Sequence, residues 1–288
     1  MSTPPFLALP ACAEALRLTT ARGEFAALLA VPAGPPRGTA LLVPGFTGSK
    51  EDFIALLEPL AAAGYRVAAV DQRGQYETGG GADRAAYAIE QFADDVSALS
   101  AELADDGPLH LLGHSFGGQV VRETVLRESV LRAGRELPWR SLTLLSSGPG
   151  AIDPAEAVRT KLLADALQSM DLESIWQLMR QLEKEPAVPL RPEIADFLHR
   201  RWVANVPEAL AAMAGHLVAA PDRVTELAAV PLPKLVLSGV QDYAWPVTEQ
   251  SAMAERLGAR RVLIDDAGHS PNAEQPAATA AALVDFWA

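Results

Sequence analysis

Residues 113–117 read Gly-His-Ser-Phe-Gly and lie between an apolar run and a helix-forming segment. A serine on a sharp strand-to-helix turn has its hydroxyl exposed, as a nucleophile requires. The flanking glycines remove side chains that would collide where the strand and the helix nearly touch. The alternative is an ordinary tight turn that requires glycine and tolerates serine. We interpret Ser115 as a candidate nucleophile.

A serine hydroxyl is a weak nucleophile near neutral pH, so a base must accept its proton. The chain contains five histidines. His269 follows the last expected strand in a glycine-flanked loop, at the edge where the catalytic groups of open parallel sheets gather. We therefore predict His269 as the base, with loop capping as the alternative. Of the other four, His114 adjoins the serine and His110 lies inside an expected strand. His199 and His216 fall in a helical stretch.

The histidine in turn needs a carboxylate to orient it. Asp242 lies just beyond the preceding strand, on the same expected edge. Asp265 and Asp266 end the strand that leads to His269, which better suits a capping or surface function. Asp71, at the end of another strand, is a weaker competitor that is expected to brace the loop after it. We predict Asp242 as the orienting acid.

Acyl transfer also needs donors for the developing oxyanion, and backbone N–H groups usually supply them. The amide of Phe116, directly after the serine, is one expected donor. The second is expected from the loop after the run that ends at Gly45, with Phe46 as the best candidate and Thr47 as the alternative. The charged residues 50–52 begin the next helix and are expected to act only as cap and dipole partners.

Short apolar runs alternate with longer helical patterns, and these elements would carry the residues above. Strands are expected at 23–32, 38–45, 66–71, 109–113, 141–149, 233–242 and 260–269. Helices are expected at 50–65, 85–103, 116–131, 247–257 and 273–287. Buried parallel strands read as continuous aliphatic runs, as most of these do. The alternation predicts an α/β fold, a mostly parallel sheet of about eight strands flanked by helices.

The alternation breaks at residues 148–150, which read Gly-Pro-Gly. From residue 151 to about residue 221 the pattern is amphipathic and helical, without a convincing strand. We therefore predict an α/β core made of residues 1–150 and 222–288, interrupted by a helical segment over 151–221.

Five motifs resemble those of the α/β-hydrolase superfamily, in the family's order and along nearly the whole chain. They read VPGFTGSKEDF, DQRGQYETGG, GHSFGGQV, GVQDYAWP and AGHSPNAEQP, and they resemble its oxyanion loop, post-strand turn, nucleophile elbow, acid loop and histidine loop. The resemblance implies a catalytic triad of Ser115, Asp242 and His269, with Phe46 and Phe116 as amide donors. The chain departs from the family at Pro44, where many members have a histidine, and at residues 74–80, where Gly-His-Gly is common.

The resemblance also implies that the helical segment, inserted after the sixth core strand, is a lid. Aromatic residues of the lid and of the acid loop are expected to line an apolar, uncharged substrate pocket. Packing between lid helices is the alternative for each of them. The substrate-binding candidates are Trp176, Trp202, Tyr243 and Trp245, with Met179, Phe197 and Met213 as further lining residues.

Composition limits the other functions that the chain could have. Its 288 residues carry a net charge of −12, which argues against a nucleic-acid-binding surface. The one cysteine, Cys12, allows no intramolecular disulfide. Neither a secretory signal nor a membrane-spanning apolar run is apparent, so a cytoplasmic location is expected. No dinucleotide or phosphate-loop motif and no metal-ligand spacing is present, so we expect no cofactor and no metal. The sequence does not indicate the oligomeric state.

We expect a serine hydrolase that cleaves carboxylic esters of small or medium apolar substrates through an acyl-enzyme intermediate. The same triad could also serve hydrolysis of C–C bonds or thioesters, or cofactor-free perhydrolysis. A serine nucleophile argues against epoxide hydrolases and dehalogenases, whose chemistry needs a carboxylate there. From another class, a non-catalytic ligand-binding protein on a hydrolase fold would keep its ligand when Ser115 is replaced.

Overall fold

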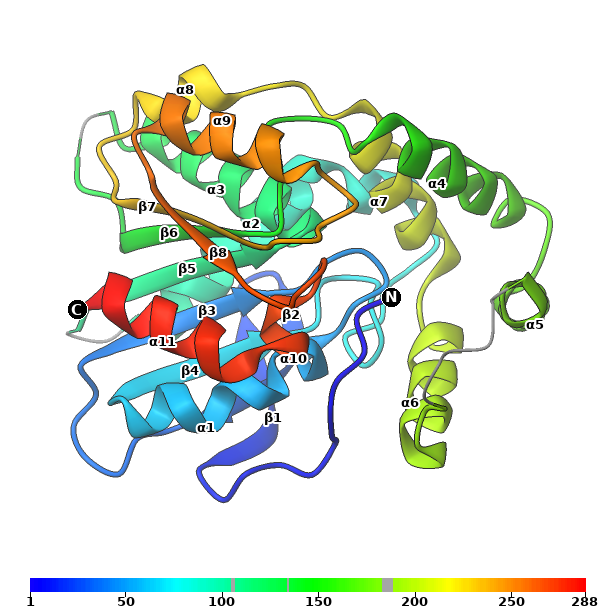
Figure 1. The fold of residues 1–288 in the computed structure, drawn as a ribbon, viewed down its shortest axis with the longest axis horizontal. Coiled ribbons are helices and arrows are strands. Elements are labelled where there is room, and N and C mark those ends of the chain that lie inside the picture. Colours follow the sequence, from blue (N-terminus) through cyan, green and yellow to red (C-terminus); the bar gives the residue numbers. More distant parts are fainter. Residues whose placement is uncertain (105–106, 134, 183–188) are drawn as a thin grey trace.

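A computed structural model of the chain describes residues 1–104, 107–133, 135–182 and 189–288. In these residues eight strands form one sheet in the order β1-β2-β4-β3-β5-β6-β7-β8 (Figure 1). The strands are β1 (Ala13–Thr20), β2 (Gly23–Ala30), β3 (Gly38–Val43), β4 (Tyr65–Val70), β5 (Leu109–His114), β6 (Trp139–Leu145), β7 (Lys234–Gly239) and β8 (Arg260–Ile264). Strands β3 to β8 run parallel, and β2 is antiparallel to both β1 and β4. The prediction of an α/β fold with a mostly parallel sheet is confirmed.

The strands differ in how clearly the sequence indicates them. Every residue of β3, β5 and β7 is buried, which is why these strands read as continuous apolar runs. Strand β1 is not among the strands expected from the sequence. It consists mostly of residues that favour helices, and only Leu18 in it is buried. It pairs with β2 along its whole length as an edge strand, so its structure depends on that pairing.

Helices cover both faces of the sheet. Helices α1 and α11 pack on one face, and α2, α3 and α9 pack on the other, each group over its own hydrophobic cluster (Figure 1). The helices of this core are α1 (Ile54–Ala62), α2 (Ile89–Leu103), α3 (Phe116–Leu131), α8 (Val224–Ala228), α9 (Val247–Leu257), α10 (Pro271–Glu274) and α11 (Pro276–Trp287), with 3-10 helices η1 (Lys50–Phe53) and η2 (Arg84–Tyr87). No helix in the part of the chain described here is long and apolar enough to cross a bilayer.

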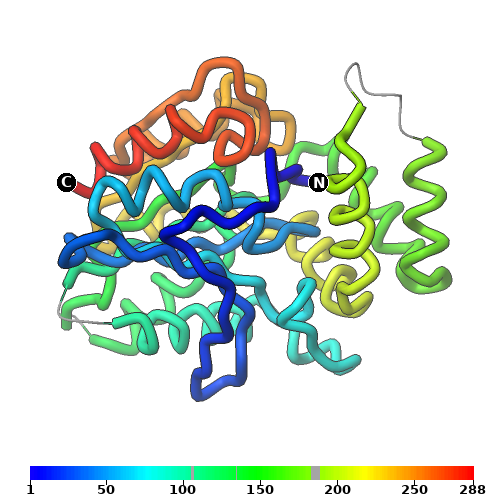
Figure 2. The backbone as a smooth tube through the Cα atoms, turned by 90° about the horizontal axis from the view of Figure 1, so that it is seen from below, coloured from blue at the N-terminus to red at the C-terminus, as the bar shows by residue number. Residues whose placement is uncertain are grey.

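Four helices separate β6 from α8: α4 (Pro154–Ala166), α5 (Leu172–Leu182), α6 (Pro192–Val203) and α7 (Pro207–Ala219). They fall within the helical segment expected over 151–221, which we call the insertion. Figure 1 shows them at one end of the sheet, with α5 and α6 furthest from it. The first residues of the chain, dark blue in Figure 2, reach the insertion, where the Ser2 carbonyl accepts a hydrogen bond from Arg201.

The parallel strands bring several loops to one edge of the sheet. The carboxyl ends of β3, β5, β6, β7 and β8 follow one another along that edge, because each of these strands pairs in parallel with the next. The loop after β3, residues 44–49, is called the β3 loop below. With it lie the turn at Ser115, the loop that holds Asp242 and the loop that holds His269. This edge is therefore where the candidate site is assembled.

Candidate active site

The turn between β5 and α3 holds Ser115 in a strained conformation. Its backbone has φ 54° and ψ −118°, a positive φ that is uncommon for a residue with a side chain. The turn is possible because its neighbours are glycines. A Cβ atom on Gly117 would lie 2.3 Å from the carbonyl oxygen of Val43, and one on Gly113 would lie 2.2 Å from the carbonyl oxygen of Gly117. The sequence around Ser115 is therefore fitted to a very close approach of β3, β5 and α3.

The side chains of Ser115, His269 and Asp242 form one hydrogen-bonded chain. His269 Nε2 lies 3.0 Å from Ser115 Oγ, and His269 Nδ1 lies 2.8 Å from Asp242 Oδ1. With its proton on Nδ1, the ring donates to the carboxylate and accepts from the hydroxyl. Ser115 and Asp242 are buried, and the His269 side chain is mostly buried. This arrangement can move a proton from a serine hydroxyl to an imidazole that a carboxylate orients.

Two further donors fix the Asp242 carboxylate. The backbone N–H of Ala244 donates to Oδ1, and the side-chain amide of Gln250 donates to Oδ2 at 2.8 Å. Burial alone would raise the pKa of Asp242, but the hydrogen bonds from His269, Gln250 and Ala244 hold it below its usual value. Gln250 was not among the residues predicted from the sequence. The sequence offers one indication of its position. Gln250 is a polar residue at helical spacing (i, i+3, i+4, i+7) from Met253, Ala254 and Leu257, so it shares their buried face of α9.

His114 supports the histidine loop. Its Nε2 lies 2.8 Å from the backbone carbonyl oxygen of His269, and its ring is buried. Burial, together with the nearby His269, lowers the pKa of His114 to about 3, so the ring is neutral at pH 7. The other three histidines have other partners. His110 contacts Ser141, His199 contacts Glu173, and His216 contacts the Tyr87 carbonyl.

The rival carboxylates lie in other surroundings. Asp71 is buried and accepts hydrogen bonds from the backbone N–H and the side chain of Lys50 and from the backbone N–H of Glu77. It thus braces both the start of η1 and the loop after β4. Asp265 and Asp266 are exposed.

The β3 loop lies directly against the serine. A Cβ atom on Gly45 would be 2.9 Å from Ser115 Cβ. Two buried amides hold the loop, since Gln75 donates to the Gly45 carbonyl at 2.7 Å and Gln72 donates to the Pro44 carbonyl at 2.8 Å. Gln75 belongs to residues 74–80, where the sequence departs from the motif it resembles, and Gln72 lies just before them; neither glutamine was predicted to have a function.

Both amides expected to serve the oxyanion are at this junction. Phe46 belongs to the β3 loop, and Phe116 is the first residue of α3. Within the described residues, the backbone N–H of neither residue donates a hydrogen bond. Thr47, the alternative, has a positive φ of 59°.

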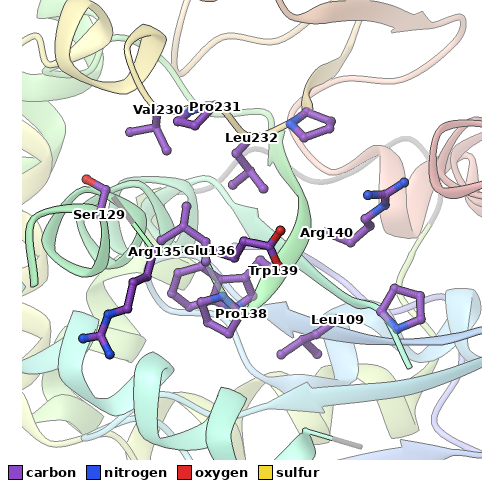
Figure 3. A pocket seen from close by; sticks show the side chains of 13 residues that line it. Leu109, Ser129, Arg135, Glu136, Pro138, Trp139, Arg140, Val230, Pro231 and Leu232 are labelled. Carbon is purple, nitrogen blue, oxygen red and sulfur yellow. The ribbon is translucent and has the colours of Figure 1, made fainter. Parts of the chain in front are cut away.

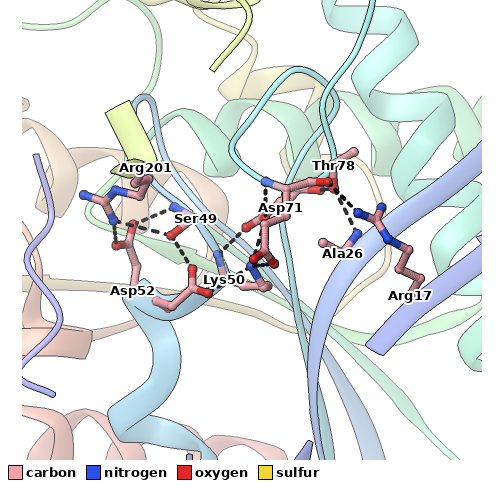
Figure 4. Close-up of polar contacts among 10 residues, drawn as sticks. Arg17, Ala26, Ser49, Lys50, Asp52, Asp71, Thr78 and Arg201 are labelled. Carbon is pink, nitrogen blue, oxygen red and sulfur yellow. Dashed lines mark hydrogen bonds and ion pairs between the residues drawn. The ribbon is translucent and has the colours of Figure 1, made fainter. Parts of the chain in front are cut away.

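The charged residues after the β3 loop do more than cap a helix, and the prediction that they act only as cap and dipole partners was wrong. Lys50 is buried and forms ion pairs with Glu51, Asp71 and Glu77 (Figure 4). Burial alone would lower the pKa of Lys50, but these carboxylates raise it above its usual range. Asp52 is also buried and pairs with Arg201 of α6. Such pairing depends on segments distant in the chain, so the local pattern gave no sign of it.

A cavity of about 130 Å³ lies at the serine, lined by Ser115, His269, Phe46 and Tyr243 among others. The other three aromatic candidates do not line it. Trp202 donates its indole N–H to the Leu172 carbonyl, and Trp245 packs against Gly148. The Trp176 ring lies 5.3 Å from the His199 ring, tilted by 38°. The prediction of an uncharged pocket was also wrong, because the lining includes Glu156 and Asp52. The aromatic pattern of the insertion reflects its own packing, in which Trp202 and Leu210 form part of a small core.

A larger cavity, of about 540 Å³, lies at the opposite ends of the strands (Figure 3). Pro108, Trp139 and Pro233 line it, and none of the candidate site residues does. Among the residues that the structure describes, no group of three or more His, Cys, Asp or Glu side chains could hold a metal ion.

Comparisons with known proteins agree with this architecture. The model of the alpha/beta hydrolase family matches residues 40–282. A protein described as a candidate carbamate hydrolase, RutD of Rhizobium rhizogenes, is 26% identical over 84% of this chain and 89% of its own. A monoacylglycerol lipase of Mycolicibacterium smegmatis is 24% identical over 80% of this chain and 79% of its own. A thermophilic esterase from Thermogutta terrifontis is 26% identical and superposes with a TM-score of 0.70, covering 95% of this chain and 97% of its own.

Proposed function

The chain belongs to the alpha/beta hydrolase family, and from that premise we propose that it is a serine hydrolase of carboxylic esters. One observation carries the proposal. The His269 ring lies between Ser115 Oγ and Asp242 Oδ1, with a hydrogen-bond distance on each side. The similarity to an esterase and to a monoacylglycerol lipase supports an ester as the substrate.

In the proposed reaction, Ser115 Oγ attacks the acyl carbonyl carbon while His269 Nε2 takes the hydroxyl proton. The carbonyl oxygen becomes an oxyanion and accepts from the amides of Phe46 and Phe116. Collapse of this intermediate breaks the bond to the alcohol oxygen, which receives the proton from His269. A water molecule then attacks the acyl-enzyme by the same route, which releases the acid and restores Ser115. Asp242 holds the ring orientation throughout and stabilises the imidazolium.

We further propose that the insertion, residues 151–221, is a lid on a core of residues 1–150 and 222–288. Glu156 and Thr160 of α4 and Leu217 of α7 line the cavity, so the insertion supplies part of its wall. A cavity of about 130 Å³ favours substrates with a short acyl group. For comparison, a protein cavity of roughly 150 Å³ holds a benzene molecule.

A carbamate is the second candidate substrate. It is favoured by the similarity to the protein described as a candidate carbamate hydrolase, which extends over most of both chains. The same serine attack applies, because a carbamate carbonyl also passes through a tetrahedral oxyanion. Thioesters and the C–C bonds of diketones remain further substrates for the same residues.

A substrate panel tests the proposal. We expect the purified protein to hydrolyse p-nitrophenyl acetate and butyrate faster than the decanoate, and a fluorophosphonate probe to label Ser115. The variant Ser115→Ala should lose both signals, and Ser129→Ala, which changes a serine of α3 distant from His269, should keep both. Turnover of a p-nitrophenyl carbamate, an acyl thioester or a diketone without turnover of any ester would reassign the substrate. Labelled Ser115 without turnover of any compound would favour a ligand-binding protein.

A further inference from the structure

A fully buried ion pair joins the insertion to the residues that follow the β3 loop. Arg201 Nη1 of α6 lies 2.6 Å from Asp52 Oδ1, and both side chains are 0% exposed. Burying two charges is costly, so such a pair is weak evidence for stability by itself. Its position points to another role, because Asp52 lines the cavity together with Ser115 and His269.

Asp52 contacts three parts of the site. Its Oδ2 accepts from the backbone N–H of Ser49 at 3.3 Å, at the end of the β3 loop. Its own carbonyl accepts from the Asn272 side chain at 2.7 Å, three residues after His269. Its Oδ1 accepts from Arg201. The β3 loop, the histidine loop and the insertion are therefore connected through this one residue. Figure 4 shows its contacts with Ser49 and Arg201.

Arg201 in turn contacts more than one segment. Its Nη2 donates to the Ser2 carbonyl at 2.7 Å, while Nη1 lies 2.6 Å from Asp52 and 3.5 Å from Ser49 Oγ. The guanidinium carbon also lies 5.3 Å from the centre of the Phe197 ring, one turn earlier on α6. A planar guanidinium can reach two acceptors in fixed directions at once, whereas a lysine ammonium is a single flexible point charge. The guanidinium thus joins α6 to Ser49 and Asp52 and to the first residues of the chain.

The β3 loop is held from two sides. Gln72 and Gln75, which follow β4, bind the carbonyls of its first residues. At its other end, Asp52 binds the Ser49 N–H and is paired with Arg201. The amide of Phe46 lies between these two attachments along the chain. A backbone donor contributes to catalysis only when it points at the position that the oxyanion will occupy.

We propose that Arg201 is a positioning residue for the β3 loop and, through Asp52 and Ser49, for the Phe46 amide. The insertion then contributes to the reaction by fixing an oxyanion donor as well as by lining the cavity. This inference rests on the proposed ester hydrolysis, because that reaction gives the Phe46 amide its function.

The variant Arg201→Met tests the inference in the full-length protein, with Arg200→Met as the matched control. Arg200 is the preceding residue of α6 and is exposed, so its replacement removes the same charge without touching the Asp52 pair. We measure kcat on p-nitrophenyl acetate per active site titrated with a fluorophosphonate. We expect Arg201→Met to lower this kcat roughly 10- to 100-fold with KM within about twofold. Arg201→Lys should recover part of the loss, and Arg200→Met should match the wild type.

A merely structural role gives a different result. It would reduce the number of titrated sites and the midpoint of unfolding but leave kcat per titrated site as in Arg200→Met, and that outcome overturns the proposal. If Arg201→Met does not fold, the double variant Asp52→Asn/Arg201→Met removes the unpaired charge. We expect the double variant to fold with the same loss of kcat. Wild-type kcat in the double variant would equally overturn the proposal.

Hydrogen exchange separates this inference from the proposed function. We expect the hydrogen-bonded amides of Gly48 and Ser49 to exchange at least about tenfold faster in Arg201→Met than in Arg200→Met, because the loop opens locally when one attachment is lost. This readout needs no turnover. An inactive wild type would refute ester hydrolysis and leave the exchange result standing, whereas unchanged exchange in an active enzyme would refute the positioning function of Arg201.

Discussion

The side-chain amide of Gln250 lies 2.8 Å from Asp242 Oδ2, the carboxylate oxygen that His269 does not contact. The same amide donates to the Trp245 carbonyl at 3.0 Å, and Gln250 is fully buried. The carboxylate that orients the histidine is thus itself oriented from the neighbouring helix α9. A hydrogen bond of this kind fixes the direction of a catalytic group without contacting the substrate.

We predict that Gln250→Met lowers kcat roughly tenfold with little change in KM, since Asp242 loses one of its donors and holds the His269 ring less firmly. Steady-state kinetics on p-nitrophenyl acetate measures both constants. Gln241→Met is the matched control, because Gln241 precedes Asp242 and is exposed. Equal kinetics in the two variants would show that the Gln250 contact does not matter for the reaction.

The two buried carboxylates Asp242 and Asp71 should respond differently to removal of their charge. Asp242→Asn is expected to lower kcat by about 10⁴, because the amide favours the wrong histidine tautomer. Asp71→Asn should act mainly on stability, costing about 3 kcal/mol, because it leaves Lys50 buried with fewer carboxylate partners. Kinetics per titrated site and urea unfolding distinguish the two effects. A large kcat loss in Asp71→Asn alone would reverse their assignments.

Two buried histidines make the fold sensitive to acid. Burial and the nearby Arg140 lower the pKa of His110 to about 4, and burial and His269 lower the pKa of His114 to about 3. Below pH of about 6.5 the unfolded chain binds protons at these residues while the folded chain does not, so stability falls as pH falls. From pH 7 to pH 5 each histidine should cost about 2 kcal/mol of the free energy of unfolding.

Urea unfolding at pH 7, 6 and 5, followed by tryptophan fluorescence, measures this loss. His110→Gln replaces the ring with a side chain that does not titrate, and it should reduce the loss by about 2 kcal/mol. An identical pH dependence in His110→Gln and the wild type would contradict the prediction.

Tyr243 should limit the size of the acyl group, because it lines the cavity and its ring centre lies 5.2 Å from that of His269. We expect Tyr243→Ala to raise the ratio of kcat/KM for the hexanoate to that for the acetate roughly tenfold. Trp176→Ala removes an aromatic ring that does not line the cavity, and it should leave the ratio unchanged. The prediction fails if both variants shift the ratio alike.

The sequence was informative where function depends on topology. The carboxyl ends of parallel strands meet at one edge, so the positions of Ser115, Asp242 and His269 after three different strands indicated that they would lie together, and in the structure they do. Helix α3 also spans the expected residues, because it begins directly at the glycine-rich turn.

The sequence was uninformative where function depends on contacts between distant segments. Gln250 and Gln75 read as ordinary polar residues, and only the packed structure shows which carboxylate or carbonyl each one binds. Trp202 was wrongly expected in the pocket, since an aromatic residue on an amphipathic helix can face either a ligand or another helix. Strand β1 was missed because its edge position allows residues that do not favour strands.

The buried pair between Asp52 and Arg201 also constrains how the protein can be redesigned. Exchanging the insertion for that of a relative would treat it as a separable module. Here a donor insertion without an arginine at the position of Arg201 would leave the Asp52 carboxylate buried and unpaired, which costs about 3–5 kcal/mol. A successful graft would have to change residue 52 together with the insertion, so the unit of exchange extends into the core.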